Sequence, residues 1–255
     1  MPNTIIRIEP NGPDGKLKRL DQPFRTEIMA TDQPLKHGYR YIDDVERGLW
    51  VGVWEATPFT MTPHAMPYNE FMLVVKGSVT MVESSGGETT IRAGESFVNP
   101  QGQDGYWKQT EVFRKFSFGF RDPAWQRPAN QDAPTVIKLD HNGKLEACPS
   151  PAAELLVGPA PVQHAHEWFR DATGQFVAGV QDTTAYRSRT IASPRHDWRH
   201  VLAGAVTLTD AVGTAHRFTA GDTFLVPLGV VCDWRCDEYL RTVYCGFQPK
   251  SAHAG

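Results

Sequence analysis

The sequence contains no apolar run long enough to span a bilayer, and it does not begin with the basic and apolar segments of a secretory signal peptide. Its 26 basic and 29 acidic residues give a formal net charge of −3, so no overall basic field points to nucleic acid. Its four cysteines have no spacing typical of a zinc ribbon. These absences favour a reduced, cytoplasmic protein that binds neither nucleic acid nor membranes.

Three common catalytic signatures are also absent, namely the G-x-S-x-G elbow, the P-loop and the G-x-G-x-x-G phosphate motif. Helical periodicity is confined to two short segments, 43–48 and 167–173. Apolar residues instead alternate with period two between turns that contain glycine, as in 71–83, 88–100 and 112–120. This pattern predicts an all-β protein whose antiparallel strands roll into a small barrel or jelly roll.

The chain contains an internal repeat. Residues 34–120 align without a gap on residues 161–247 at a constant offset of 127 positions. RAGESFVNPQG at 92–102, for example, falls on TAGDTFLVPLG at 219–229. Identical pairs concentrate at Gly, Pro, Trp and apolar positions, which fix backbone turns and the core. We therefore expect two domains of one fold.

The boundary between the repeats lies in a segment composed like a linker. Residues 122–134, DPAWQRPANQDAP, are rich in Pro, Asn and Asp. The prediction is an N-terminal domain over 1–125 and a C-terminal domain over 135–255. The segments that precede the two copies are loosely similar as well, IIRIEPNG at 5–12 and VIKLDHNGKL at 136–145.

The Gly and Pro skeleton of each repeat resembles that of the cupins, whose pattern is G-x5-H-x-H-x3,4-E-x6-G followed by G-x5-P-x-G-x2-H-x3-N. The phrases PYNEFMLVVKGSVTM and AGESFVNPQGQDGYW are most similar to the ethanolamine-utilisation-type cupins. The resemblance covers both halves, so it implies a bicupin with two tandem jelly-roll β-barrels. It also implies a homodimer, because cupins commonly pair through exposed barrel strands.

The resemblance implies a metal held by three His and one Glu, but the ligand set is incomplete. The first repeat keeps His64 and Glu70 and has Met66 and Gly105 at the other two positions. We therefore expect no resident cofactor. The alternative is a divalent transition metal in the N-terminal cupin on His64 and Glu70, with help from elsewhere in the chain. In the second repeat the four positions hold Ile191, Ser193, Asp197 and Cys232.

Glu70 corresponds to an inward-facing position of the family, so alternation along the strands predicts what lines the first barrel. A carboxylate desolvated beside an indole can act as a general acid or base, with His64 and Tyr68 as hydrogen-bond donors. The alternative is a structural Glu70, bound in a salt bridge. The side chains expected to contact a ligand here are Thr62, Met72 and Trp107.

The same alternation predicts an arginine-rich second barrel. Three inward guanidinium groups would need anionic partners, which a bound carboxylate or phosphate could supply. The alternative is a one-residue slip, which would place these arginines in solvent. The expected lining residues are Arg187, Arg189, Asp197, Arg199, Cys232 and Trp234.

Two functional hypotheses follow from these barrels. In the first, the bicupin binds a small polar, anionic metabolite in a barrel lumen and acts on it as a lyase, isomerase or hydrolase through Glu70. In the second, it is a non-catalytic metabolite-binding or regulatory cupin with degenerate metal sites. The cupin fold does not decide between them, because it supports many chemistries.

Overall fold

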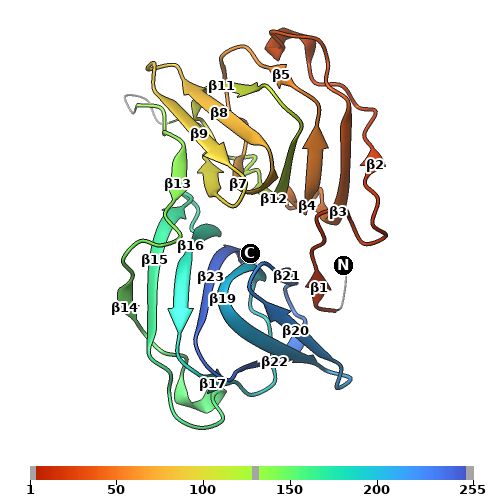
Figure 1. The fold of residues 1–255 in the computed structure, drawn as a ribbon. Coiled ribbons are helices and arrows are strands. Elements are labelled where there is room, and N and C mark those ends of the chain that lie inside the picture. Colours follow the sequence, from red (N-terminus) through yellow and green to blue (C-terminus); the bar gives the residue numbers. More distant parts are fainter. Residues whose placement is uncertain (1–3, 128–131, 251–255) are drawn as a thin grey trace, which may run out of the picture. The chain divides into compact units, whose positions relative to one another are not determined.

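The computed structural model describes residues 4–127 and 132–250. The chain forms two compact units (Figure 1). One unit, the N-terminal barrel, comprises Glu9–Leu139, and the other, the C-terminal barrel, comprises Met1–Ile8 together with Asp140–Gly255. Apart from two short 3₁₀ turns, η1 (Thr26–Ile28) and η2 (Ala153–Leu155), the regular elements of the described residues are β-strands. The all-β prediction is therefore confirmed.

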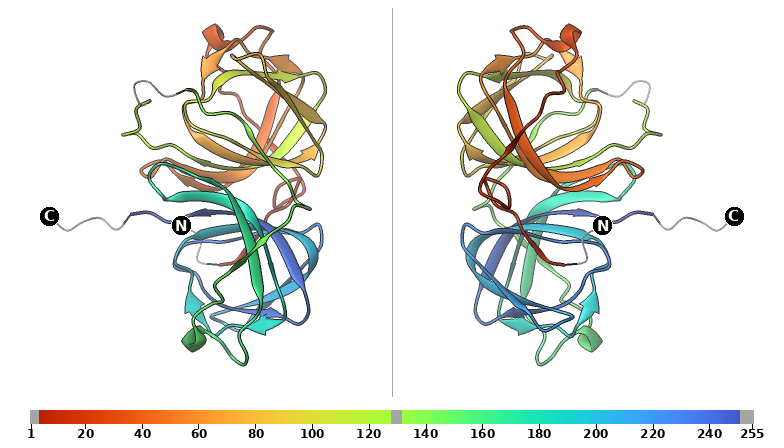
Figure 2. Two further views of the ribbon diagram at one scale, coloured as in Figure 1. Left: turned by 90° about the vertical axis from the view of Figure 1, so that its left-hand side faces the viewer. Right: turned by 90° about the vertical axis from the view of Figure 1, so that its right-hand side faces the viewer.

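The N-terminal barrel consists of two antiparallel sheets, with strand orders β13-β10-β7-β12-β4-β3-β2 and β5-β11-β8-β9. Strand β6 pairs with β11 beside β5. Figure 2 shows how these strands curve around a common interior. The strands are β2 (Lys18–Arg19), β3 (Lys36–Asp44), β4 (Leu49–Ala56), β5 (Phe59–Thr60), β6 (His64–Ala65), β7 (Asn69–Lys76), β8 (Ser78–Glu83), β9 (Glu88–Arg92), β10 (Ser96–Asn99), β11 (Asp104–Gln109), β12 (Phe113–Phe120) and β13 (Ile137–Leu139).

The C-terminal barrel repeats this arrangement in one continuous sheet, whose main path is β1-β21-β19-β23-β16-β15-β14. Strand β22 pairs with β17, β18 and β19, and β20 pairs with β19. The strands are β1 (Ile6–Arg7), β14 (Glu146–Cys148), β15 (Gln163–Arg170), β16 (Phe176–Thr183), β17 (Tyr186–Arg187), β18 (Ile191–Ala192), β19 (His196–Asp210), β20 (Ala215–Thr219), β21 (Thr223–Val226), β22 (Val231–Cys236) and β23 (Leu240–Phe247).

The long strand β19 covers the positions that β7 and β8 occupy in the N-terminal barrel. It pairs with β21 and β23 along its first half and with β20 and β22 along its second. Gly204 lies where the pairing changes, with a φ of +80°. A Cβ atom at Gly204 would lie 1.8 Å from the carbonyl oxygen of Tyr239. Only glycine fits this close approach of two backbones.

Each repeat is preceded by a short strand, its leading strand, which is β1 for the first repeat and β13 for the second. Each leading strand pairs with a strand of the other repeat. Strand β1 pairs with β21, with Ile6 opposite Leu225. Strand β13 pairs with β10, with Ile137 opposite Val98. Strand β1 therefore belongs to the C-terminal unit and strand β13 to the N-terminal unit, which differs from the division expected from the sequence. Residues 128–131 of the expected linker lie outside the described residues.

Aromatic side chains fill the interior of the N-terminal barrel. The rings of Phe59 and Trp107 stack with an interplanar angle of 10°, and Phe113 meets Trp107 edge to face at 5.2 Å between centroids. Full burial of such a side chain stabilises a fold by about 1.5–3 kcal/mol. The buried residues of this cluster are Ala56, Phe59, Met72, Val74, Val79, Met81, Ile91, Phe97, Trp107 and Phe113.

Smaller side chains dominate the interior of the C-terminal barrel. Phe218 and Phe224 stack at 4.4 Å, and Tyr186 and Trp234 are only partly buried against the cluster. The buried residues are Ile5, Val201, Val206, Leu208, Phe218, Phe224, Val226, Val230, Cys232, Cys236 and Leu240.

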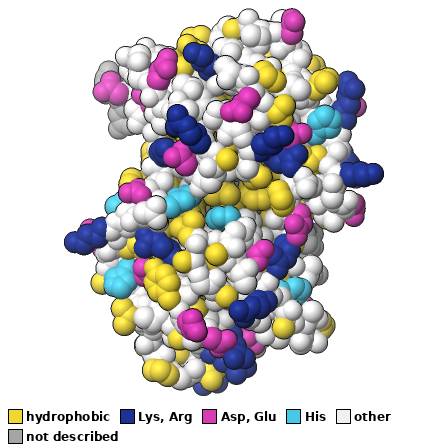
Figure 3. All heavy atoms as spheres, in the orientation of Figure 1, with side chains coloured by type: hydrophobic (Ala, Val, Ile, Leu, Met, Phe, Trp, Pro, Cys, Tyr) yellow, Lys and Arg dark blue, Asp and Glu magenta, His cyan; other side chains and the backbone are white. Residues whose placement is uncertain are grey.

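On the face drawn in Figure 3, basic and acidic side chains are interspersed over both units, as the small net charge leads one to expect. No helix among residues 4–127 and 132–250 has the length and hydropathy needed to cross a membrane.

Candidate functional site

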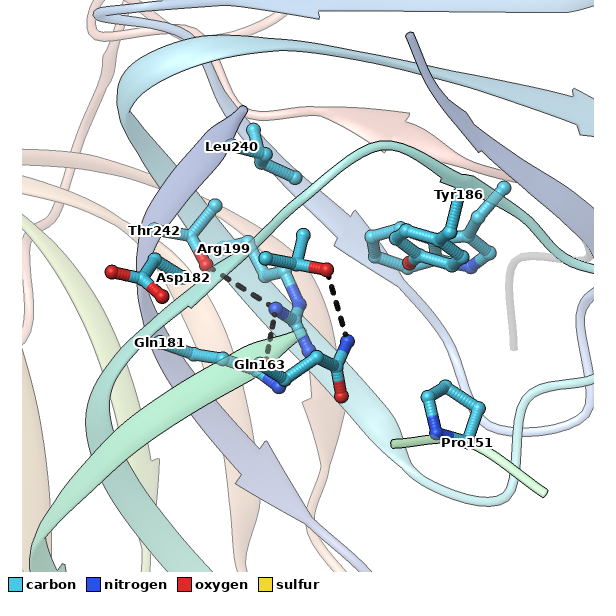
Figure 4. A pocket seen from close by; sticks show the side chains of 10 residues that line it. Pro151, Gln163, Gln181, Asp182, Tyr186, Arg199, Leu240 and Thr242 are labelled. Atoms are coloured by element: carbon cyan, nitrogen blue, oxygen red, sulfur yellow. Dashed lines mark hydrogen bonds between the residues drawn. The ribbon is translucent and has the colours of Figure 1, made fainter. Parts of the chain in front are cut away.

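A cavity of about 160 Å³ lies among β15, β16, β17, β19, β22 and β23 of the C-terminal barrel (Figure 4). Since water in the liquid takes up about 30 Å³ per molecule, this space corresponds to about five water molecules. Most of the lining side chains are polar, although the site lies beside the apolar core. The lining residues are Pro151, Gln163, Gln181, Asp182, Thr183, Tyr186, Arg199, Trp234, Leu240 and Thr242.

The repeat explains why the C-terminal barrel is hollow at this place. At the offset of 127 residues, Gln181 corresponds to Trp54 and Leu240 to Phe113 of the N-terminal barrel. There Trp54 and Phe113 both pack edge to face against Trp107, at 6.3 and 5.2 Å between centroids. Replacing these two aromatic rings by smaller side chains leaves space, and the amide of Gln181 makes its lining polar.

Arg199 of β19 is the main cationic group of the cavity. Its Nε donates to Asp197 Oδ2 at 3.1 Å, and its Nη1 donates to Gln181 Oε1 at 3.0 Å and Thr242 Oγ1 at 3.2 Å. The guanidinium carbon lies 5.2 Å from the ring centroid of Trp234. A guanidinium has five N–H donors, and the two on Nη2 have no partner among the residues that the structure describes. Because Arg199 lines the cavity, these two donors are available to a ligand.

Asp197 lies between two arginines. Arg195 Nη2 donates to Asp197 Oδ1 at 3.1 Å, on the side opposite Arg199. Burial alone would raise the pKa of Asp197, but the two guanidinium groups outweigh it and hold the pKa below its ordinary value. Asp197 is therefore ionised at neutral pH. With two cations and one anion, the cluster carries one excess positive charge in a largely buried place.

The second carboxylate of the lining, Asp182, is already paired. Arg241 Nη1 lies 3.4 Å from Asp182 Oδ2, and the Tyr239 hydroxyl donates to the same oxygen at 3.0 Å. His164 Nδ1 lies 2.9 Å from the other oxygen. Asp182 therefore does not offset the excess charge beside Arg199.

Neutral groups complete the lining. Gln163 Nε2 donates to Thr183 Oγ1 at 3.3 Å. Burial raises the pKa of Tyr186 to about 12, so its phenol is protonated at neutral pH and keeps its O–H donor.

Two of the arginines expected in this barrel point outward, which corrects the prediction. Arg187 and Arg189 are exposed, whereas Tyr186 lines the cavity and Ser188 is buried. Residues 188–195 lie between β17 and β19 and contain the short strand β18 and turns, so strict alternation does not hold from one strand to the next. For these two arginines the structure agrees with the alternative of a one-residue slip, which places them in solvent.

Of the other residues expected in this barrel, Arg199 and Trp234 line the cavity, and Asp197 binds Arg199 directly. Cys232 is buried in the apolar core cluster. Burial raises the pKa of the Cys232 thiol to about 11, so it is an uncharged packing residue at neutral pH.

In the N-terminal barrel, Glu70 is buried and bound by two donors. Lys115 Nζ lies 2.8 Å from Glu70 Oε1, and the Ser117 hydroxyl donates to the same oxygen. Lys115 was missed in the sequence analysis. The signal was its position on β12, because alternation puts residues 115 and 117 on the same face as Phe113, which lies in the core.

Two other residues expected in this lumen surround Lys115. Its Nζ lies 2.9 Å from Met72 Sδ and 5.2 Å from the ring centroids of both Trp54 and Trp107. The ammonium group is therefore enclosed by aromatic faces that attract it. Met72 and Trp107 contribute to the packing of this barrel around the ion pair.

The remaining residues expected in the first site have partners of their own. Thr62 Oγ1 donates to the carbonyl of Glu27 at 3.0 Å, and His64 Nδ1 lies 2.8 Å from the carbonyl oxygen of Thr62. Because a carbonyl only accepts, this ring nitrogen carries the proton. Tyr68 packs edge to face on Trp50 at 4.8 Å, and burial raises its pKa above the ordinary value.

These contacts do not fit a metal on the family's ligand positions. The carboxylate of Glu70 binds the Lys115 ammonium, and Met66 and Gly105 cannot replace imidazoles. Within residues 4–127 and 132–250, three or more His, Cys, Asp or Glu side chains nowhere gather closely enough to hold an ion. Lys115 supplies the positive charge beside Glu70 from the protein itself.

Solved structures share the fold of the whole chain at low identity. A Pseudomonas syringae pv. tomato protein of the DUF861 family, described as being of unknown function, has a TM-score of 0.75 at 21% identity, over 96% of this chain and 100% of that chain. A cupin 2 conserved barrel domain protein from Leptotrichia buccalis has a TM-score of 0.56 at 10% identity, over 89% and 97%. A DUF861 protein from E. coli has a TM-score of 0.55 at 10% identity, over 98% and 93%. No curated protein matches the chain.

The family assignment rests on both repeats. The model of the EutQ-like cupin domain matches residues 47–116 and 170–244, which together make up more than half of the chain. The two matched segments contain most of the strands of each barrel, including β19 with Arg199. The resemblance noted in the sequence is thus confirmed, and the chain belongs to the EutQ-like cupin family and carries two copies of its domain.

Proposed function

We propose that this bicupin binds a small anionic metabolite in the cavity of its C-terminal barrel. The observation that carries the proposal is that Arg199 lines the cavity and that its two Nη2 donors have no partner among the described residues. A hydrogen bond to a charged donor stabilises a complex by about 1.5–3 kcal/mol, and the oxygens of a ligand could accept from these two N–H groups. Guanidinium groups bind carboxylates with two parallel hydrogen bonds, which makes a carboxylate the favoured ligand group.

Charge and size narrow the ligand further. The excess positive charge of Arg195, Asp197 and Arg199 is balanced by one negative charge, so a monoanion fits better than a dianion. A cavity that corresponds to about five water molecules accommodates a carboxylate of two or three carbons. Trp234 offers a flat surface beside the guanidinium for the carbon atoms of such a ligand.

The contacts of Glu70 favour binding over acid–base catalysis at that residue. Both Lys115 and Ser117 bind Glu70 Oε1, and the carboxylate would have to leave a buried ion pair before it could accept a proton from a substrate. We therefore place the function on Arg199, and interpret the Glu70 pair as part of the structure of the N-terminal barrel.

Calorimetric titration with acetate and propanoate tests the proposal, and thermal unfolding with the same anions gives a second readout. We expect saturable binding to the wild-type protein and to Arg187→Gln, and none to Arg199→Gln. Arg187 is a matched control, because it is an exposed arginine of the same barrel. Binding that survives Arg199→Gln, or the absence of binding of both anions to the wild-type protein, would overturn the proposal.

A further inference from the structure

The hydrogen bonds of Thr183 fix the orientation of the Gln163 amide. Thr183 has one hydroxyl hydrogen, and it donates this hydrogen to the carbonyl of Thr184 at 3.0 Å. Thr183 Oγ1 can therefore only accept from Gln163, so Nε2 of that amide must face Thr183. Gln163 Oε1 consequently points away from Thr183, and it has no donor among the residues that the structure describes.

The hydrogen bond from Arg199 fixes the orientation of the Gln181 amide, whose oxygen, rather than its nitrogen, faces the bonding partner. Arg199 Nη1 can only donate, so Gln181 must turn Oε1 toward it. Gln181 Nε2 then faces away from Arg199 and has no acceptor among the described residues. Figure 4 shows the side chains of both glutamines, with a dashed line for the hydrogen bond between Gln181 and Arg199.

The cavity therefore contains groups of both kinds. Arg199 Nη2 and Gln181 Nε2 are donors, whereas Gln163 Oε1 is an acceptor. The two glutamines come from β15 and β16, which are neighbouring antiparallel strands. A simple anion such as acetate offers acceptors only, and would leave Gln163 Oε1 without a donor.

We propose that the ligand is a short hydroxycarboxylate, whose carboxylate accepts from Arg199 and Gln181 and whose hydroxyl donates to Gln163 Oε1. This inference rests on the proposed function, because it concerns the same cavity. A hydroxyl fits better than an ammonium group as the donor, since the site already carries excess positive charge. The available volume restricts the hydroxyl to a carbon close to the carboxylate.

Glycolate and propanoate form the test pair, because they have the same number of non-hydrogen atoms and differ by a hydroxyl in place of a methyl group. Titration calorimetry at one pH and ionic strength gives both dissociation constants. We expect the wild-type protein to bind glycolate about fivefold more tightly than propanoate, since one additional hydrogen bond contributes about 1 kcal/mol to binding.

The variant Gln163→Met removes the acceptor and keeps a side chain of similar length. We expect it to lose the preference for glycolate while it still binds propanoate through Arg199. Gln248→Met is the matched control, because Gln248 is exposed in the same barrel, and we expect it to keep the wild-type preference.

The outcomes separate the two proposals. Equal affinities of the wild-type protein for glycolate and propanoate would overturn the hydroxycarboxylate and leave the anion site intact, and so would a glycolate preference that persists in Gln163→Met. Failure of both anions to bind the wild-type protein would overturn the anion site and this inference together.

Discussion

Substitution of Lys115 by methionine tests whether the cation beside Glu70 stabilises the N-terminal barrel. The ammonium group lies 2.8 Å from Glu70 Oε1, and less than a tenth of either side chain is exposed. Removing one partner of a buried pair costs about 3–5 kcal/mol, because the other charge stays buried without compensation. Ser117 still donates to Glu70, and Met fills most of the volume, so we expect a loss of about 3 kcal/mol.

Guanidinium unfolding followed by tryptophan fluorescence measures this loss, since Trp54 and Trp107 both lie 5.2 Å from the ammonium group. The double variant Glu70→Gln/Lys115→Met removes both charges, and we expect it to recover about 1–2 kcal/mol relative to Lys115→Met. A Lys115→Met protein as stable as the wild type, or a double variant less stable than the single one, would refute the reasoning.

Three further predictions concern the C-terminal barrel. The folded pKa of Asp197 is depressed, so its stabilising effect is present at neutral pH and is lost as the pH falls below about 4; thermal unfolding from pH 7 to pH 3 should show a steeper loss for the wild type than for Asp197→Asn. Gly204→Ala should cost several times the roughly 1–2 kcal/mol expected for Gly213→Ala in urea unfolding, since both residues have positive φ but only the Gly204 Cβ would strike a backbone oxygen. Leu240→Phe, which copies the ring of the N-terminal barrel, should fill the cavity and weaken propanoate binding by about tenfold or more in calorimetry; unchanged affinity would contradict the assignment of the cavity.

The sequence allows the all-β class and the duplication to be predicted, because period-two alternation and turn glycines are local signals. It does not reveal that the leading strands are exchanged. Segments 5–12 and 136–145 resemble each other, so the sequence of each is compatible with pairing to β10 or to β21. Only the path of the chain in space decides between the two pairings.

The residues of the site could be predicted only where they lie on regular strands. Arg199 and Trp234 follow from alternation along regular strands. Arg187 lies beyond an irregular stretch, where counting fails. Lys115 was missed because β12 is buried on both faces, so that its apolar residues conceal which positions face the lumen.

The exchange of leading strands also bears on how the protein is made. The N-terminal barrel receives its last strand, β13, only when residue 139 has left the ribosome, after the segment that follows Phe120 of β12 has been synthesised. Until then the edge of β10 lacks its neighbour and is open to pairing with another nascent chain. Strand β1 cannot pair until β21, more than 200 residues downstream, has been synthesised. Each compact unit therefore takes its leading strand from the segment that precedes the other repeat, and an isolated N-terminal segment expressed as 1–125 would lack β13.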